Sequence, residues 1–344
     1  MQSIFLLLIS LTINGAQGER LLGRVNPETR ELSWPGTGVA FSFTGSSATI
    51  NLQRVSGSNS VELTVDGIAT VIPSVSGASI STPPGLSNGT HKVVLRKRSE
   101  ALFGSIFLGN ITTVGTFEKD DEVTRKIEFI GDSITVGYGL DGVNPCQNNA
   151  SVENNPKTYG ALTAGALKAD YAMIAWSGIG LTRNYPSNSP DPSPIMPVRW
   201  TRYNPNDANN SYPFPAAAIP NVVVINLGTN DFSYVGMRDP LNVDIYIAAM
   251  VQFIKDIKVH YPTATFFLVA SPMIGDDYPA GDKTKTVQKK ALGTVVKQLN
   301  GTDVHLVDWP TQGSDVGCDY HPSAAAHKLG ASVVSAAIAE KLGW

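Results

Sequence analysis

The pattern of apolar residues changes near residue 120, and this change limits the chain to a fold with two unlike parts. Before it, short runs alternate apolar and polar residues, with turn-forming residues between them; the runs are 39–43, 48–52, 61–65 and 92–96. The pair Asp66-Gly67 after the third run is typical of a hairpin turn. Because alternation with a period of two is typical of half-buried strands, residues 19–122 are predicted to form an all-β, jelly-roll-like sandwich domain.

After residue 122, nearly continuous apolar runs alternate with segments of helical periodicity. The apolar runs are 126–130, 171–175, 222–227, 265–270 and 304–307, and the helical segments are 159–167, 243–260, 284–299 and 324–342. Strands buried on both faces are apolar throughout, and strands that alternate with helices build parallel sheets. Residues 123–344 are therefore predicted to form an α/β domain around a doubly wound, five-stranded parallel sheet.

The first 18 residues have the features of a signal peptide, an apolar run at 4–13 followed by small residues that end at Gly18. The run is too short to span a bilayer, so a secreted protein is expected. Five sequons predict glycosylation, at Asn88, Asn110, Asn149, Asn209 and Asn300. The two cysteines, Cys146 and Cys318, can pair in an oxidising compartment or remain two buried thiols.

The charge balance excludes some classes of partner. The formal net charge is -3, and charged residues make up 16% of the chain, against about 25% in typical soluble domains. The chain has no basic block, which argues against binding to nucleic acid or to an anionic membrane. We expect a monomer with a neutral partner. None of the five histidines forms a pair at metal-ligand spacing, and no helix opens on the glycine-rich stretch 137–142, so neither a metal nor a nucleotide cofactor is expected.

Four candidate residues follow predicted strands, at the edge where parallel α/β sheets bind ligands. Ser133 lies in a Gly-Asp-Ser motif after the first strand, Gly178 follows the second, Asn230 follows the third, and His321 precedes the last helix. A serine hydroxyl needs an adjacent base such as histidine to act as a nucleophile, and backbone N–H groups and amides can stabilise an oxyanion. Each motif alone has an ordinary structural explanation, but together they predict an acyl-transfer site.

These motifs resemble those of the SGNH (GDSL-like) hydrolase superfamily, over residues 125–344. The variant at 131–139, preceded by a β-sandwich, is similar to carbohydrate esterase family 2, whose members deacetylate plant polysaccharides and sugars. The resemblance implies that Ser133 is the nucleophile and His321 the general base. It also implies an oxyanion hole formed by the N–H groups of Ser133 and Gly178 and the side chain of Asn230.

The third catalytic member is left open by the sequence. The superfamily commonly has an acid three residues before the base, but Cys318 occupies that position here. Asp319 could orient His321 instead, or a backbone carbonyl could do so in a Ser-His dyad, while Asp315 is a less favoured substitute. In this frame, a disulfide between Cys146 and Cys318 would tie the nucleophile and base loops together.

The expected function is that of a secreted carbohydrate acetylesterase that removes O-acetyl groups from xylan or glucomannan through an acetyl-enzyme. Tyr185 and the loop 187–215 are candidate substrate contacts. The alternatives are a GDSL-type esterase or lipase that acts on other acyl esters, and a non-catalytic sugar-binding protein that presents Trp34 and Phe41. An unperturbed His321 would lose its function as a base below a pH of about 6.5.

Overall fold

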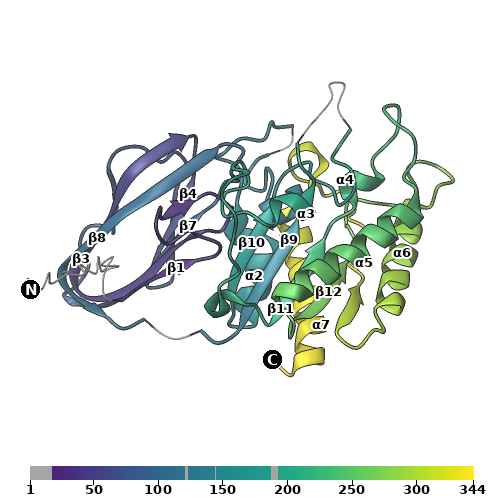
Figure 1. Cartoon of the computed structure of the whole chain (residues 1–344). Coiled ribbons are helices and arrows are strands. Elements are labelled where there is room, and N and C mark those ends of the chain that lie inside the picture. Colours follow the sequence, from purple (N-terminus) through teal and green to yellow (C-terminus); the bar gives the residue numbers. More distant parts are fainter. Residues whose placement is uncertain (1–17, 121–122, 144, 187–192) are drawn as a thin grey trace, which may run out of the picture.

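The computed structural model describes residues 18–120, 123–143, 145–186 and 193–344, which form an all-β domain beside an α/β domain (Figure 1). The strands of the first domain are β1 (Glu19–Leu22), β2 (Glu31–Leu32), β3 (Gly38–Gly57), β4 (Val61–Val65), β5 (Ile68–Ile72), β6 (Ser79–Ser81), β7 (Gly89–Lys97) and β8 (Gly104–Glu118). The strands of the second are β9 (Lys126–Gly131), β10 (Asp170–Ala175), β11 (Val222–Asn226), β12 (Thr265–Val269) and β13 (Val304–Val307). Its helices are α1 (Ser133–Val136), α2 (Tyr159–Ala166), α3 (Met196–Arg199), α4 (Thr229–Phe232), α5 (Val243–His260), α6 (Thr284–Gln298) and α7 (Ala324–Leu342), with 3₁₀ turns at Asn155–Lys157, Ala216–Ala218 and Cys318–Tyr320.

The all-β prediction is confirmed, and the long strand β3 organises the domain. It spans 20 residues and joins the two short strands expected at 39–43 and 48–52. One edge of β3 pairs with β7 and then β6, and the other pairs with β1 and then β8, so eight strands form one antiparallel sheet around an apolar core. Asp66 and Gly67 form the predicted hairpin turn between β4 and β5, with φ angles of 51° and 82°.

The five-stranded parallel sheet is also confirmed, in the order β10-β9-β11-β12-β13. The ends of the five strands and of α2, α5, α6 and α7 fall within one residue of the sequence prediction, and the four-residue helices α1, α3 and α4 were not predicted. Alternate residues of β9 face opposite sides: Ile127 and Phe129 enter the core that includes α2 and α7, and Ile130 enters the core that includes α5 and α6. Because β10 and β11 flank β9, the loops after these three strands meet at one edge.

The two domains share buried contacts. Trp34 of the first domain is fully buried and belongs to the same apolar cluster as Trp200 and Phe253 of the second. Arg24 and Glu128 form a buried ion pair across the same junction, at 2.9 Å. Phe41 is also fully buried, in the core of the all-β domain. Trp34 and Phe41 therefore support packing, and neither is presented to a sugar at the surface.

Some sequence predictions fall outside the described residues. The predicted signal peptide lies outside them except for Gly18, as do 121–122 in the link between the domains and 187–192 in the long loop. The five sequon asparagines, Asn88, Asn110, Asn149, Asn209 and Asn300, are all described and exposed, as a glycan requires, and their glycosylation stays a prediction. Within the described ranges, no helix combines the length and the apolar composition needed to cross a bilayer.

Candidate active site

Ser133 lies in a tight turn between β9 and α1. A Cβ atom on Gly131 would lie 2.0 Å from Oγ1 of Thr135, so the turn requires glycine at this position. Asp132 caps α1, because its Oδ1 accepts a hydrogen bond from the N–H of Ile134 at 3.0 Å. Burial raises the pKa of Asp132 to about 7. Ser133 begins the helix, so its N–H points away from the helix's own acceptors and can bind an anion.

The structure brings Ser133 and His321 together. Oγ of Ser133 lies 2.8 Å from Nε2 of His321. Nδ1 of His321 lies 3.2 Å from the main-chain oxygen of Asp319, while the Asp319 carboxylate accepts a hydrogen bond from the hydroxyl of Tyr138 at 2.8 Å. The Asp315 carboxylate instead accepts a hydrogen bond from the residue that caps α7. Of the alternatives left open by the sequence, the backbone carbonyl is the group that contacts the imidazole.

The surroundings of His321 favour its neutral form. The ring of Tyr138 stacks on the imidazole, with centroids 4.0 Å apart and an interplanar angle of 19°. Burial lowers the pKa of His321 from 6.5 to about 4, and hydrogen bonds with the main chain of Asp319 and Cys318 oppose this shift only in part. The expectation of an ordinary histidine pKa is therefore corrected: the imidazole remains an unprotonated base well below pH 6.5.

The predicted disulfide is present and holds the loop of His321 against the loop that follows Ser133. Cys146 and Cys318 are bonded, with their Cα atoms 5.3 Å apart. Gly139 has a φ of +56°, and a Cβ atom there would lie 2.2 Å from Cβ of Cys318, so this close approach requires glycine. The N–H of His321 also donates to the main-chain oxygen of Cys318 at 2.9 Å. The disulfide thus begins three residues before the base and restrains its backbone.

Gly178 and Asn230 lie on the loops that flank the nucleophile. Gly178 follows β10 with a φ of +79°, and its carbonyl accepts a hydrogen bond from the N–H of Tyr185 at 2.7 Å. Asn230 lies in α4, after β11, and its Nδ2 donates to the main-chain oxygen of Ile179 at 2.7 Å. The same nitrogen lies 3.5 Å from Oδ2 of Asp132. Asn230 therefore lies between the nucleophile turn and the Gly178 loop, where an oxyanion hole requires a donor.

Asp231 is a buried residue of the site that the sequence analysis did not single out. Its carboxylate accepts hydrogen bonds from the N–H groups of Leu181, Thr182 and Arg183, at 2.9, 2.7 and 3.2 Å. These bonds hold the loop after β10 to α4. Its position beside Asn230 at the end of a predicted strand was a usable signal, but the sequence gives no sign that the carboxylate turns back toward a neighbouring loop.

A small cavity and three exposed tyrosines lie at this edge of the sheet. The cavity opens beside Gly178 and is lined in part by Trp176 and Tyr185. Tyr185 is 56% exposed, Tyr278, on the loop after β12, is 71% exposed, and Tyr320, beside the base, is 73% exposed. Only Tyr185 was predicted as a substrate contact, because the spacing of the other two gives no pattern.

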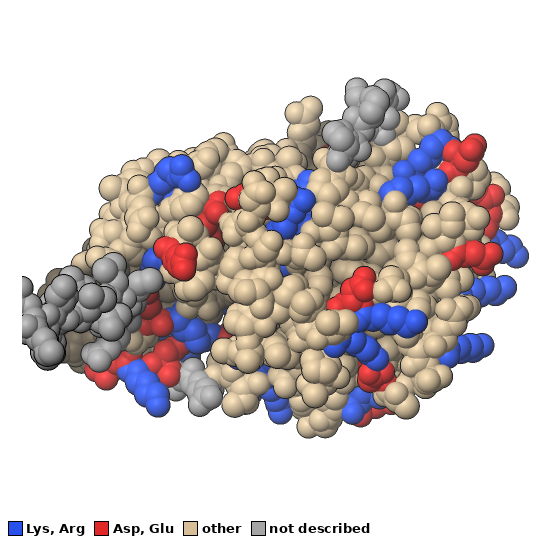
Figure 2. All heavy atoms as spheres, viewed as in Figure 1, with Lys and Arg blue, Asp and Glu red and all other residues tan. Residues whose placement is uncertain are grey.

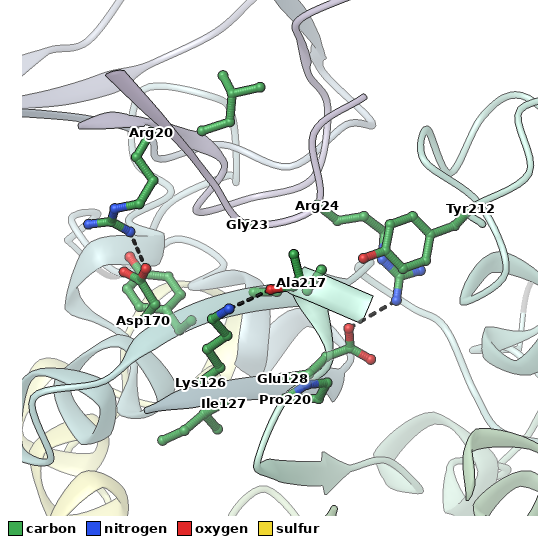
Figure 3. Close-up of a pocket in the computed structure, with 14 residues that line it drawn as sticks. Arg20, Gly23, Arg24, Lys126, Ile127, Glu128, Asp170, Tyr212, Ala217 and Pro220 are labelled. Atoms are coloured by element: carbon green, nitrogen blue, oxygen red, sulfur yellow. Dashed lines mark hydrogen bonds and ion pairs between the residues drawn. The ribbon is translucent and has the colours of Figure 1, made fainter. Parts of the chain in front are cut away.

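A second cavity lies at the opposite, amino-terminal edge of the sheet, between the domains (Figure 3). Its charged groups pair with each other: Arg20 with Asp170, and Arg24 with Glu128. The ammonium group of Lys126 donates to a main-chain carbonyl. Apart from Nε of Arg24, which is buried without a partner, these charged groups have partners in the protein. Ser133 and His321 meet at the carboxyl-terminal edge, which is therefore the candidate active site.

Comparison with known families agrees with this arrangement. The model described as Carbohydrate esterase 2 N-terminal matches residues 21–118, and that of the GDSL-like Lipase/Acylhydrolase family matches residues 129–329. A crystal structure of a Corynascus thermopiles (Myceliophthora fergusii) carbohydrate esterase family 2 enzyme with a carbohydrate binding domain is 60% identical, with a TM-score of 0.93, and the match covers 95% of this chain and 100% of that one. The chain belongs to carbohydrate esterase family 2. This confirms the predicted family and, with it, the class of carboxylic-ester hydrolase.

Three further matches describe the relatives of this family 2 esterase. Cellulase/esterase CelE of Acetivibrio thermocellus is 34% identical over 93% of this chain, which spans only 38% of the length of CelE. An acetylxylan esterase / glucomannan deacetylase of Cellvibrio japonicus is 33% identical, over 92% of this chain and 87% of that protein. A family two carbohydrate esterase from Clostridium thermocellum, solved in complex with cellohexaose, is 33% identical with a TM-score of 0.84, over 95% of this chain and 100% of that one.

Proposed function

We propose that this family 2 esterase is a secreted carbohydrate acetylesterase that removes O-acetyl groups from plant polysaccharides such as xylan or glucomannan. The observation that carries the proposal is the 2.8 Å contact between Oγ of Ser133 and Nε2 of His321. A hydroxyl at this distance from a neutral imidazole can transfer its proton as it attacks an ester. The name of the Cellvibrio japonicus relative, acetylxylan esterase / glucomannan deacetylase, supports acetyl as the acyl group that is removed from the substrate.

The proposed reaction has two steps. Oγ of Ser133 attacks the acetyl carbonyl carbon while its proton passes to Nε2 of His321. The oxyanion of the tetrahedral intermediate accepts hydrogen bonds from the N–H groups of Ser133 and Gly178 and from the side-chain amide of Asn230. Collapse of the intermediate breaks the bond to the sugar oxygen, which takes the proton from His321 and leaves as a hydroxyl, so that an acetyl-enzyme remains. Water, deprotonated by His321, then releases acetate and regenerates Ser133.

His321 is proposed to act in a Ser-His dyad. As a neutral base it carries its proton on Nδ1, and this N–H donates to the main-chain oxygen of Asp319 at 3.2 Å. The carbonyl therefore fixes the tautomer that leaves Nε2 free to accept the serine proton. The Asp319 carboxylate, bonded to Tyr138, is assigned to the shape of the loop rather than to proton transfer.

The surface around the site suits a neutral polysaccharide. Tyr185, Tyr278 and Tyr320 present exposed rings at the catalytic edge, and aromatic rings with a polar tip bind sugars through their apolar face and their hydroxyl. On the face shown in Figure 2, charged side chains are sparse and mixed in sign. The complex of the Clostridium thermocellum relative with cellohexaose supports a glycan as the ligand.

The test compares acetate release by the parent protein and by Ser133→Ala. The substrates are acetylated xylan, acetylated glucomannan and a p-nitrophenyl ester series of increasing acyl length. We expect the parent to release acetate from at least one polysaccharide and to prefer acetyl among the p-nitrophenyl esters. Loss of the nucleophile should lower kcat by about 10⁴-fold or more. The thermal midpoint of the variant should stay close to that of the parent, because the Ser133 hydroxyl bonds only to His321 among the described residues.

Two other outcomes would replace the proposal. A preference for long acyl chains would assign the esterase to other acyl esters such as lipids. If the parent released no acetate but bound cello- or xylo-oligosaccharides, the protein would be a sugar-binding module that retains an inactive dyad. Oligosaccharide binding by calorimetry, measured on the same preparation, separates these two results.

A further inference from the structure

One buried carboxylate of the all-β domain reaches the loop that carries Gly178. Glu100 follows β7 and is fully buried. Its Oε2 accepts a hydrogen bond from the N–H of Ser177 at 2.9 Å, across the domain junction. Ser177 directly precedes Gly178, so one residue of backbone separates the nitrogen held by Glu100 from the nitrogen assigned to the oxyanion hole. The position of the Gly178 N–H therefore depends on a residue from the other domain.

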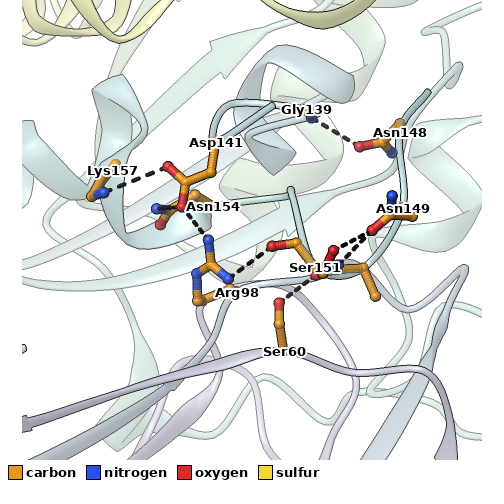
Figure 4. Close-up of polar contacts among 10 residues, drawn as sticks. Ser60, Arg98, Gly139, Asp141, Asn148, Asn149, Ser151, Asn154 and Lys157 are labelled. Carbon is orange, nitrogen blue, oxygen red and sulfur yellow. Dashed lines mark hydrogen bonds and ion pairs between the residues drawn. The ribbon is translucent and has the colours of Figure 1, made fainter. Parts of the chain in front are cut away.

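A second buried carboxylate links Glu100 to the loop after the nucleophile. Oε2 of Glu153 accepts a hydrogen bond from the N–H of Glu100, and Oε1 accepts one from the amide of Asn148, both at 2.7 Å. Oδ1 of Asn148 in turn accepts a hydrogen bond from the N–H of Gly139 at 2.8 Å (Figure 4). Gly139 follows Tyr138, whose ring stacks on the general base. A series of hydrogen bonds thus connects the loop of Gly178, through Glu100, to Gly139, which follows the tyrosine stacked on His321.

These carboxyl groups lie in a water-poor environment. Glu100 and Glu153 both have 0% exposure, as does Lys97, whose ammonium group donates to the main-chain oxygens of Ser99 and Glu100 at 2.6 and 3.0 Å. Burial, followed by the charge of Glu100, raises the pKa of Glu153 well above its usual range. Hydrogen bonds in such a medium are stronger and more directional than in water, so they hold their partners firmly.

Two other residues of the all-β domain bind the loop that follows Ser133, at residues 141–151. Arg98, which is fully buried, donates to the main-chain oxygen of Ser151 at 3.1 Å and pairs with the carboxylate of Asp141. The hydroxyl of Ser60 donates to the main-chain oxygen of Ala150. Figure 4 shows these contacts on one side of the loop and the Gly139–Asn148 bond on the other. Arg98 and Ser60 of the all-β domain therefore hold this loop in place on the side that faces that domain.

We propose that Glu100 is a positioning residue for the oxyanion hole, so that the all-β domain contributes directly to turnover. The role assigned to the Gly178 N–H rests on the proposed function. A positioning role predicts that the location of the Glu100 carboxylate controls kcat, whereas a purely structural role predicts that it controls only stability. The length of the side chain and its charge can be varied separately to distinguish the two.

The test uses Glu100→Asp and Glu100→Gln in the full chain. Aspartate keeps the carboxyl group but withdraws the acceptor by one methylene group, and we expect kcat to fall about 10- to 100-fold with KM nearly unchanged, as for misplaced catalytic groups. Glutamine keeps the length and the acceptor oxygen, so kcat should stay within about threefold of the parent, because only part of one hydrogen bond's energy is lost. Both kinetic constants are measured with p-nitrophenyl acetate.

Glu128→Asp is the matched control. Glu128 is also a buried carboxylate at the domain junction, and it accepts hydrogen bonds from Arg24 at 2.9 Å and Trp200 at 2.7 Å. It serves the amino-terminal edge of the sheet, away from Ser177. Its shortening should lower the thermal midpoint and leave kcat within about twofold, because surviving native molecules keep an intact site.

The outcomes separate the positioning role from the proposed function. A parent that releases no acetate rejects the proposed function itself. An active parent whose Glu100→Asp variant keeps full kcat, or loses no more than Glu128→Asp, overturns only the positioning role. If Glu100→Asp does not fold, Glu100→Leu, which keeps much of the side-chain volume but has no acceptor, is compared with Glu100→Gln: a kcat that is lost only in folded Glu100→Leu supports the placed acceptor, and equal kcat values in the two variants overturn it.

Discussion

The two edges of the parallel sheet use the same kinds of side chain in opposite ways. At the amino-terminal edge, Glu128 accepts hydrogen bonds from Arg24, Trp200 and Tyr261, and the charges that line the cavity there are paired with one another. At the carboxyl-terminal edge, Oγ of Ser133 and Nε2 of His321 instead contact each other at 2.8 Å, a pair that can react with an ester. The comparison teaches that burial of polar groups does not by itself mark a functional site; what marks it here is a nucleophile and a base in contact.

The backbone beside His321 adopts an uncommon conformation. Beside the base, two consecutive non-glycine residues, Asp319 and Tyr320, adopt left-handed conformations with φ angles of 48° and 61°. Such conformations cost about 1 to 3 kcal/mol each and persist only where the surroundings enforce them. The disulfide of Cys318 and the hydrogen bond from the amide of Gln312 to the main-chain oxygen of Tyr320, at 2.6 Å, supply that enforcement. This left-handed backbone places the main-chain oxygen of Asp319 next to Nδ1 of His321.

The strongest test of this difference between the two edges is to remove a hydrogen-bond donor from the carboxyl-terminal edge. Asn230→Ala should lower kcat by about 10²- to 10³-fold, because one hydrogen bond to the oxyanion is lost. Asn226→Ala is the matched control: this buried amide, at the end of β11, donates to the main-chain oxygen of Val269 at 3.1 Å and not toward Ser133. Steady-state kinetics and thermal midpoints of both variants are compared.

Asn226→Ala should lower the thermal midpoint but leave kcat nearly unchanged. Equal losses of kcat in the two variants would contradict the assignment of Asn230 to the oxyanion hole. A loss of stability in Asn230→Ala without a loss of kcat would contradict it as well, since that amide would then serve only its bond to Ile179.

The pH profile is the second test and has a smaller expected effect. The proposed base is neutral His321, so activity should be lost as pH falls through its pKa, which burial lowers to about 4. The acid limb of kcat/KM should therefore lie well below 6.5, with activity retained at pH 5.5 and a loss of about tenfold per pH unit only below the shifted pKa. An acid limb at 6.5 or above would show that the imidazole is hydrated like an exposed one.

The sequence predicted the parallel sheet and its four long helices to within one residue because each of these elements carries a complete local pattern, whereas α1, α3 and α4 are too short to show one. The same reasoning identified Ser133, Gly178, Asn230 and His321, since motifs at successive strand ends converge at one edge. It could not predict the contact of Glu100 with Ser177. That contact joins residues 77 positions apart in different domains, and neither side chain belongs to a periodic pattern. The direction of the Asp319 carboxylate was equally inaccessible, because it depends on a left-handed backbone.

Asp319→Asn is expected to have the smallest effect of the three. Asparagine tolerates the left-handed conformation and keeps the main-chain oxygen that contacts Nδ1 of His321, so kcat should fall by less than about tenfold. The same change in a triad whose carboxylate orients the histidine costs about 10⁴-fold. Tyr138→Phe is the companion variant: it keeps the stacked ring and removes only the bond to Asp319 at 2.8 Å, and should match Asp319→Asn. A loss near 10⁴-fold in Asp319→Asn alone would restore the carboxylate as the third catalytic member, and the two edges would then differ less than the dyad implies.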